Sequence, residues 1–232
     1  MNNELLIDLL KLIDKEVPNN INYDKGVDLW KKNLITKKAL NWDDKIIEAE
    51  KKYLKSMLSI KKPISVYDIV GVINKYNEKL VLWDEDVTNI VVDAIAIPAS
   101  FDISDIKKKE LHEIYYMNGI RLRKKIISIM DDEKLNANEV LITRSYGIFA
   151  DYILHVNYGD NIKESIVNIL ENCRVNMIKS VIITCNFSLD DLKIIYDTIC
   201  EYLDKYEMLF DKVIIALEDI TYENELIKYI KG

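Results

Sequence analysis

The feature that most constrains this chain is a change in its hydrophobic pattern near residue 78. From there to residue 230, short runs rich in β-branched residues alternate with stretches whose apolar residues recur every three or four positions. Strands that alternate with helices indicate a layered α/β sheet, and runs as apolar as Ser180–Thr184 suit parallel strands with helices on both faces. The predicted strands are Lys79–Trp83, Val91–Ile97, Glu139–Thr143, Tyr152–Val156, Ser180–Thr184 and Lys212–Leu217.

Helices are predicted in the intervals between these strands. One covers about 104–131 and is expected to break near Gly119. The next two have apolar residues at helical spacing over 162–177 and 192–203, and a last helix covers 223–230.

The first part of the chain has a different character, because its apolar spacing is helical. Apolar residues share one helix face over 5–13, and a longer helix is predicted over 42–58. A short helix capped by Ser65 is expected to follow. The sequence therefore predicts two domains, an N-terminal helical extension over 1–75 and an α/β domain over 76–232.

Charge and hydropathy exclude several classes of protein. The chain has 32 Lys and Arg against 39 Asp and Glu, a formal charge of −7, which argues against a nucleic-acid-binding protein. No apolar run approaches the roughly 18 residues of a membrane-spanning helix. The N-terminus carries acids and lacks the basic start of a signal peptide. We therefore expect a cytoplasmic protein that binds neither nucleic acid nor membrane.

Glycine, histidine and cysteine are scarce. The chain has six glycines, two histidines and three cysteines, whereas about 7% glycine is ordinary. The chain therefore has few of the residues needed to build a Gly-rich phosphate loop or a metal site of His and Cys ligands. The cysteines Cys173, Cys185 and Cys200 show no CxxC spacing and are expected to be buried free thiols. The sequence contains neither a G-x-S-x-G nor a GxxxxGK[ST] motif.

Four segments, in order, resemble a macrodomain, the α/β module that binds ADP-ribose. Trp83–Thr88 (WDEDVT) resembles the family's W-x-G-D-I-T, and Val92–Ser100 (VDAIAIPAS) resembles V-D-A-I-V-N-A-A-N. Leu141–Tyr146 and Tyr152–Val156 resemble K-I-T-x-A-Y and Y-V-I-H-T-V, and Lys179–Thr184 resembles the strand before the second phosphate loop. The resemblance implies a macrodomain-like mixed sheet flanked by helices on both faces, preceded by an N-terminal helical extension.

A narrower resemblance points to the zinc-dependent protein-ADP-ribosyl hydrolase macrodomains, which are sometimes found beside bacterial sirtuins. Gly119–Arg123 (GIRLR) is similar to that subgroup's G-I-Q-L-R, which follows its zinc loop. The subgroup also carries an N-terminal helical extension, and Trp42–Leu54 resembles its S-E-E-F-L-x-x-Q-D-E-Y-L. The resemblance therefore covers nearly the whole chain.

The resemblance implies a small set of ligand-binding residues. Asp86 and Val87 match the positions whose carboxylate and backbone N–H contact adenine, and a carboxylate suits an exocyclic amine. Tyr222 follows the last strand, where macrodomains can place an aromatic side chain beside adenine. Two alternatives stay open: Asp86 caps a turn before Thr88, and Tyr222 serves packing alone.

The pair of asparagines that positions the distal ribose in the family is missing here. The matching residues are Ile97, which cannot form a side-chain hydrogen bond, and Ser100. Ser100 can still make one polar contact with a ligand, although a serine that starts a turn or helix is the alternative. Pro98, between them, has no N–H and fixes its own φ.

The two loops that hold zinc and phosphate in the family are also altered. In place of the zinc loop, residues 101–110 contain no Cys, His or Gly, and His112 stands alone on a helix. Asp102 and Asp105 are best explained as partners of a helix N-terminus. In place of the second phosphate loop, residues 185–191 have no glycine and end in two acids. We therefore expect no metal, no cofactor and no catalytic residue.

Two functions follow from these matches. The first is a degenerate, non-catalytic macrodomain that binds an unknown protein partner, through the former ligand cleft or through the N-terminal helices. The second is a protein that still uses the cleft, as a receptor for ADP-ribose or an adenosine-like ligand or as an ADP-ribosyl hydrolase that works without zinc. Asp86 is the main support for the second function. An unrelated α/β protein is the remaining alternative.

Overall fold

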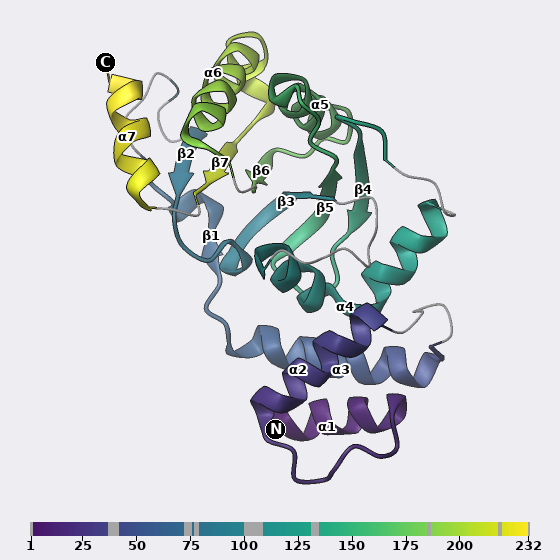
Figure 1. Cartoon of the computed structure of the whole chain (residues 1–232). Helices are drawn as coiled ribbons and strands as arrows, with labels where there is room; N and C mark the ends of the chain where they lie inside the picture. Colours follow the sequence, from purple (N-terminus) through teal and green to yellow (C-terminus); the bar gives the residue numbers. More distant parts are fainter. Residues whose placement is uncertain are drawn as a thin grey trace. The chain divides into compact units, whose positions relative to one another are not determined.

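The computed structural model describes residues 2–36, 42–71, 76, 79–99, 109–130, 135–184, 187–217 and 220–231. The chain forms two compact units (Figure 1). The first unit contains Met1–Lys62, Asp102–Glu133 and Ser145–Ile148, and the second contains Pro63–Phe101, Lys134–Arg144 and Phe149–Gly232. The boundary near residue 75 stays a prediction of where separately folding domains divide.

The first unit is helical. Its helices are α1 (Asn2–Ile13), α2 (Tyr23–Thr36), α3 (Asp44–Ile60) and α4 (Lys109–Met130). The helix expected over 42–58 is α3, and Asp43 caps it by accepting a hydrogen bond from the backbone N–H of Ile46. The core of the unit contains Trp30 and Trp42, whose stacked rings lie 6.0 Å apart between centroids. These helices confirm the N-terminal helical part of the predicted fold.

The second unit contains the sheet. Among the described residues, seven strands pair in the order β2-β7-β6-β3-β5-β4, with β1 beside β3. All pairs are parallel except β4 with β5. The mixed sheet confirms the predicted class, and β1, two residues long, was not predicted. The strands are β1 (Ile64–Ser65), β2 (Leu80–Trp83), β3 (Ile90–Pro98), β4 (Val140–Arg144), β5 (Ala150–Val156), β6 (Ser180–Ile183) and β7 (Lys212–Ala216).

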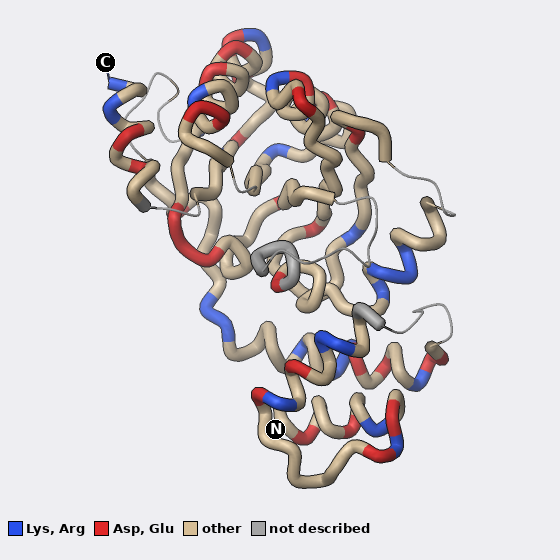
Figure 2. The backbone as a smooth tube through the Cα atoms, viewed as in Figure 1, with Lys and Arg blue, Asp and Glu red and all other residues tan. Residues whose placement is uncertain are grey.

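Three helices of the second unit pack on one face of this sheet. They are α5 (Ile162–Val175), α6 (Leu189–Tyr206) and α7 (Ile220–Lys231), and their apolar faces share one core with alternate residues of β3, β5, β6 and β7. Side chains of these strands that point the other way are buried too, as a sheet covered on both faces requires. Charged residues of both signs lie along the helices, and the strands carry few (Figure 2).

Short elements complete the second unit. They include the 3₁₀ helices η2 (Val66–Asp68), η4 (Val87–Asn89) and η6 (Glu207–Leu209). The short helix expected after Ser65 is η2, and the Ser65 hydroxyl accepts a hydrogen bond from the backbone N–H of Tyr67. None of the helices in the described ranges is long and apolar enough to span a membrane.

The aspartate of the V-D-A-I segment has a structural role at the start of β6. One Asp93 carboxylate oxygen accepts hydrogen bonds from the backbone N–H groups of Lys179 (2.8 Å) and Ser180 (2.9 Å). In return, the Ser180 hydroxyl oxygen accepts from the Asp93 backbone N–H at 2.9 Å. This exchange fixes the register of two central strands and so positions the edge where they end.

Candidate functional site

The candidate site is the edge of the sheet at which the parallel strands end. In the second unit, β2, β3, β6 and β7 run parallel, so their carboxyl ends meet at one edge, where ligands of open α/β sheets bind. Of the predicted site residues, Asp86 and Val87 follow β2, and Tyr222 follows β7 within α7. Ser100, which comes two residues after β3, lies outside the described residues.

Asp86 serves as the cap of the short helix that it precedes. Its carboxylate accepts hydrogen bonds from the backbone N–H (2.9 Å) and the hydroxyl (2.6 Å) of Thr88, and from the Asn89 side-chain amide (3.0 Å). This is the turn-capping arrangement named above as the alternative. The residue is nevertheless exposed to solvent, so an oxygen lone pair can still meet a ligand.

The other two described site residues are half-buried. Val87 is the first residue of η4, and Tyr222 packs against the core of the second unit. Packing therefore accounts for most of the surface of Tyr222, which is the alternative given for it. The structure adds no contact that ties either residue to a ligand, and their ligand roles stay predictions.

The chain that leaves β6 turns back into the core. Thr184 bonds twice to the carbonyl oxygen of Ala96, through its backbone N–H (3.0 Å) and its hydroxyl (2.9 Å). Cys185 and Asn186 lie outside the described residues. The next residue, Phe187, is only 5% exposed, and its ring meets that of Tyr158 edge to face at 5.3 Å. A buried aromatic side chain thus stands within the stretch that matches the family's second phosphate loop.

That stretch ends by starting helix α6. The Ser188 hydroxyl accepts from the backbone N–H of Asp191 (3.2 Å), and the Asp191 carboxylate accepts from the backbone N–H of Ser188 (3.2 Å). This reciprocal pair is a capping box. The Asp191 carboxylate therefore already satisfies a backbone donor, and together with Asp190 it places negative charge at a helix start that could otherwise bind phosphate.

His155, on β5, has a structural role. Its ring is 1% exposed, and Nε2 lies 2.9 Å from the hydroxyl of Thr143 on β4. Burial lowers the pKa of His155 to about 3, so the ring stays neutral at physiological pH. It therefore bridges two strands and is not poised for acid–base chemistry near neutral pH.

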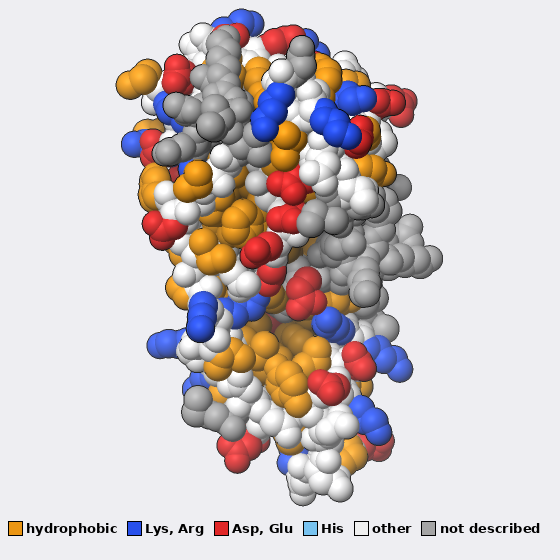
Figure 3. Space-filling view, turned by 90° about the vertical axis from the view of Figure 1, so that its left-hand side faces the viewer, with side chains coloured by type: hydrophobic (Ala, Val, Ile, Leu, Met, Phe, Trp, Pro, Cys, Tyr) orange, Lys and Arg blue, Asp and Glu red, His pale blue; other side chains and the backbone are white. Residues whose placement is uncertain are grey.

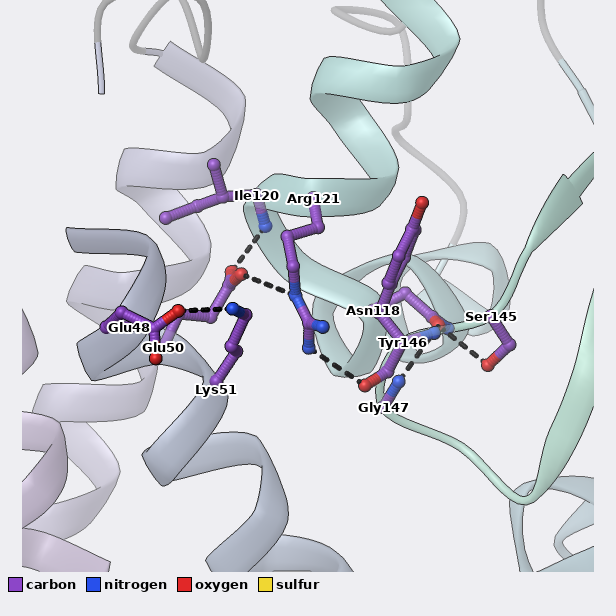
Figure 4. Close-up of polar contacts among 9 residues, drawn as sticks. All are labelled: Glu48, Glu50, Lys51, Asn118, Ile120, Arg121, Ser145, Tyr146 and Gly147. Carbon is purple, nitrogen blue, oxygen red and sulfur yellow. Dashed lines mark hydrogen bonds and ion pairs between the residues drawn. The ribbon is translucent and has the colours of Figure 1, made fainter. Parts of the chain in front are cut away.

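Within the first unit, the segment that resembles G-I-Q-L-R forms a kink (Figure 4). Gly119 interrupts α4 with φ of 61°, which confirms the predicted break. The carboxylate of Glu50, on α3, accepts a hydrogen bond from the freed backbone N–H of Ile120, and its other oxygen lies 3.7 Å from Nε of Arg121. A Cβ atom at position 119 would overlap the Glu50 carboxylate, so only glycine fits there.

Arg121 and Asn118 connect the kinked segment to the loop after β4 through hydrogen bonds. Arg121 donates to the carbonyl oxygen of Tyr146 at 3.1 Å, and its guanidinium lies 4.8 Å from the centre of that ring. The Asn118 amide oxygen accepts from the Ser145 hydroxyl (2.9 Å) and from the backbone N–H groups of Tyr146 (2.6 Å) and Gly147 (3.1 Å). The segment is therefore a structural junction of the first unit.

Sequence reasoning did not identify Glu50 as part of this junction. Its side chain is fully buried, and burial raises its pKa to about 7, although the N–H groups of Ile120 and Arg121 oppose that shift. One signal was present, since Glu50 comes four residues after Ile46 and four before Leu54, on the apolar face of α3.

The described residues contain no group of three or more His, Cys, Asp or Glu side chains that could hold a metal ion. Of residues 101–110, which replace the zinc loop, 101–108 lie outside the described residues, as do the side chains of 109–112. The expectation that this segment binds no metal therefore stays a prediction.

Comparison with known sequences gives a limited match. No family model matches the chain. Among curated proteins, "Protein GDAP2 homolog" from Drosophila melanogaster is 28% identical over 105 residues. These residues are 44% of the chain and only 19% of that much longer protein.

Comparison with solved structures gives a consistent fold. The GDAP2 macro domain aligns with a TM-score of 0.63 at 18% identity, covering 72% of this chain and 96% of that one. The Trypanosoma brucei macrodomain in complex with ADP gives a TM-score of 0.65 at 16% identity, over 99% of this chain and 97% of that one. Its complex with ADP-ribose gives 0.64 at 16% identity, over 86% and 94%. The chain therefore has the macrodomain fold.

Proposed function

We propose that this chain is a non-catalytic macrodomain that acts by binding a protein partner. It does not bind ADP-ribose in the way that a nucleotide-binding macrodomain does. The observation that carries the proposal is the exit from β6. There Phe187 is buried in the core and Ser188 begins a helix with a capping box, in the stretch where the family's loop has glycines. Backbone N–H groups that cradle a pyrophosphate need close approach of the anion, which glycine permits.

The end of β3 supports the same proposal. Ile97 stands where the resemblance places the first ribose-binding asparagine, and its side chain is fully buried. It pairs in register with His155 of β5 and cannot donate to or accept from a ribose hydroxyl. The nearby Ala99 backbone N–H is already bonded to the carbonyl oxygen of Val156 at 2.7 Å.

A second candidate function is binding of ADP-ribose or an adenosine-like ligand, with or without zinc-independent hydrolysis of ADP-ribosyl groups. Asp86 favours it, because its exposed carboxylate follows β2 at the position that the resemblance assigns to adenine. The structural likeness to a macrodomain solved with ADP-ribose supports it as well. This function needs the phosphate contacts to come from residues other than glycine-loop backbone.

Calorimetric titration of the purified chain separates the two functions. We expect no heat of binding with either ADP-ribose or adenosine up to about 1 mM. A dissociation constant of about 1 mM corresponds to a binding free energy of about −4 kcal/mol. Binding that is lost in Asp86→Asn but kept in the matched control Asp84→Asn, an exposed acid of the same turn, would overturn the proposal. Release of ADP-ribose from a modified protein in the presence of a metal chelator would overturn it too.

A further inference from the structure

The first unit contains a cavity of about 280 Å³ among helices α2, α3 and α4. Figure 3 shows a hollowed hydrophobic area with acidic side chains beside it on the surface formed by the N-terminal helices. Drug-sized ligands occupy pockets of about 300–1,000 Å³, so this cavity suits a group of the size of one side chain.

Aromatic side chains form much of the cavity wall. Tyr53, Trp30 and Tyr116 are at least nine-tenths buried, and Tyr23 completes the set. Burial raises the pKa of Tyr53, so its hydroxyl stays uncharged at physiological pH. Four aromatic side chains thus line one small cavity, and aromatic rings attract cations.

The rim of the cavity is acidic. Asp24 and Asp28 lie one turn apart on α2 and are exposed, and neither carboxylate has an ion pair or hydrogen bond among the residues that the structure describes. Asp24 belongs to the first helical turn, where a negative charge also favours the helix dipole. Asp28 lies beyond that turn, so the dipole does not account for it. Both acids lie at the mouth of an aromatic cavity.

The chain itself already places one alkylammonium group at this rim. The Lys31 ammonium nitrogen lies 3.2 Å from a carboxylate oxygen of Glu113 and 5.0 Å from the centre of the Tyr116 ring. Lys31, Glu113 and Tyr116 all line the cavity. The same combination of carboxylate and ring therefore binds a lysine side chain within the molecule.

One buried donor of the cavity wall has no acceptor. Trp30 is 2% exposed, and its indole N–H has no hydrogen-bond partner among the described residues. A buried N–H without an acceptor is unfavourable by about 1–3 kcal/mol. Because this nitrogen is itself inaccessible to solvent, a ligand in the cavity does not bond to it, and its N–H signal instead reports changes in the cavity wall.

From these observations we propose that the cavity binds a lysine side chain presented by the partner protein, with the ammonium group at Asp24 and Asp28. The apolar stem lies against the aromatic wall. This inference names the chemistry of the partner and rests on the proposed function, that the chain binds a protein. The acidic rim argues for a basic side chain over an acidic or apolar one.

NMR titration of the full chain tests the inference with blocked amino acids as probes. The indole N–H signal of Trp30 is the readout. The probes are Nα-acetyl-lysine N-methylamide, whose side-chain ammonium group is free, and Nα-acetyl-norleucine N-methylamide. They share a linear stem and differ in charge. We expect the lysine probe to bind at least about tenfold more tightly than norleucine. Equal binding of the two, or no shift at about 10 mM, would overturn the inference.

Surface variants test the rim without disturbing the core. Asp28→Asn should weaken the lysine probe about threefold to tenfold, whereas Asp8→Asn, an exposed acid of α1 outside the cavity, should leave it unchanged. Lys31→Met should tighten binding, because it removes the cation that pairs with Glu113. Loss of affinity in Lys31→Met, or equal effects of the two aspartate variants, would contradict the inference.

The identity of the partner group has its own control. Butylamine has the stem and charge of the lysine side chain but no peptide backbone. If it binds as tightly as the blocked lysine, the site is one for free amines and the assignment to a partner protein is wrong. The calorimetry with ADP-ribose reports on the proposed function alone, and the NMR titration reports on the cavity. Failure of the proposed function and failure of this inference can therefore be distinguished.

Discussion

The buried carboxyl group of Glu50 leads to a specific prediction about how stability depends on pH. Burial raises the pKa of Glu50 from 4.5 to about 7, despite the backbone N–H of Ile120 and the charge of Arg121. Near pH 4 the group is protonated in both the folded and the unfolded chain. Between pH 4.5 and 7 the unfolded chain releases this proton and the folded chain keeps it, so stability falls as pH rises.

The size of the effect follows from that interval. At about 1.4 kcal/mol for each pH unit, the interval from 4.5 to about 7 corresponds to about 3 kcal/mol. Glu50→Gln removes the titration and keeps an oxygen that can accept from Ile120. We therefore expect the free energy of unfolding of the variant, relative to the natural chain, to rise by about 3 kcal/mol between pH 4.5 and 7.5.

Urea unfolding followed by circular dichroism, at several pH values across this range, measures the difference. Using the change of the difference with pH removes any constant effect of the substitution, and the charge of Arg121 is already included in the shifted pKa of Glu50. The control is Glu48→Gln on the same helix, whose carboxylate lies on the surface and pairs with Lys51 (Figure 4). If the curves of the natural chain and Glu50→Gln stay parallel, the carboxylate is not held in the buried state described here.

Three further predictions concern stability, each read from the midpoint of urea unfolding. Gly119→Ala should destabilise the chain by about 2 kcal/mol or more, because it adds a positive φ penalty to an overlap with Glu50; a neutral result would mean that the kink is absent. Asp93→Ala should remove two charge-assisted hydrogen bonds at the start of β6 and lower stability by about 2 kcal/mol, and Asp93→Asn should recover part of it. Ser188→Ala should lower stability by about 1 kcal/mol through loss of the capping box, and an unchanged midpoint would show that α6 does not begin at that residue.

Most of the fold could be predicted from the sequence because its signals are local. The period of the apolar residues located six of the strands and the helices between them, and Gly119 marked the break in α4. β1 was missed because two residues cannot show a period of two, and its only support is pairing with β3. The order of the strands was not predicted, since periodicity says nothing about which strands pair.

The candidate site was less predictable for a physical reason. Sequence reasoning could state which residue types are missing from a ligand loop, as for Ile97 and 185–191, because each loop is one continuous segment. It could not find a contact between Glu50 and Ile120, which are 70 residues apart. Nor could it find the cavity of the first unit, whose wall combines residues of α2, α3 and α4. Such features depend on tertiary packing, which a local pattern does not encode.

Glycine is scarce in this chain but is present where close packing requires it. At Gly119 and Gly147 a Cβ atom would overlap, respectively, the Glu50 carboxylate and the Met117 carbonyl oxygen, so glycine stands where close packing requires it. Low overall glycine content therefore does not explain why residues 185–191 have none. In that stretch the backbone donors at the start of α6 are used by a capping box, and its early acids repel anions. A single substitution to glycine there would restore neither the free N–H groups nor the positive field that a pyrophosphate needs.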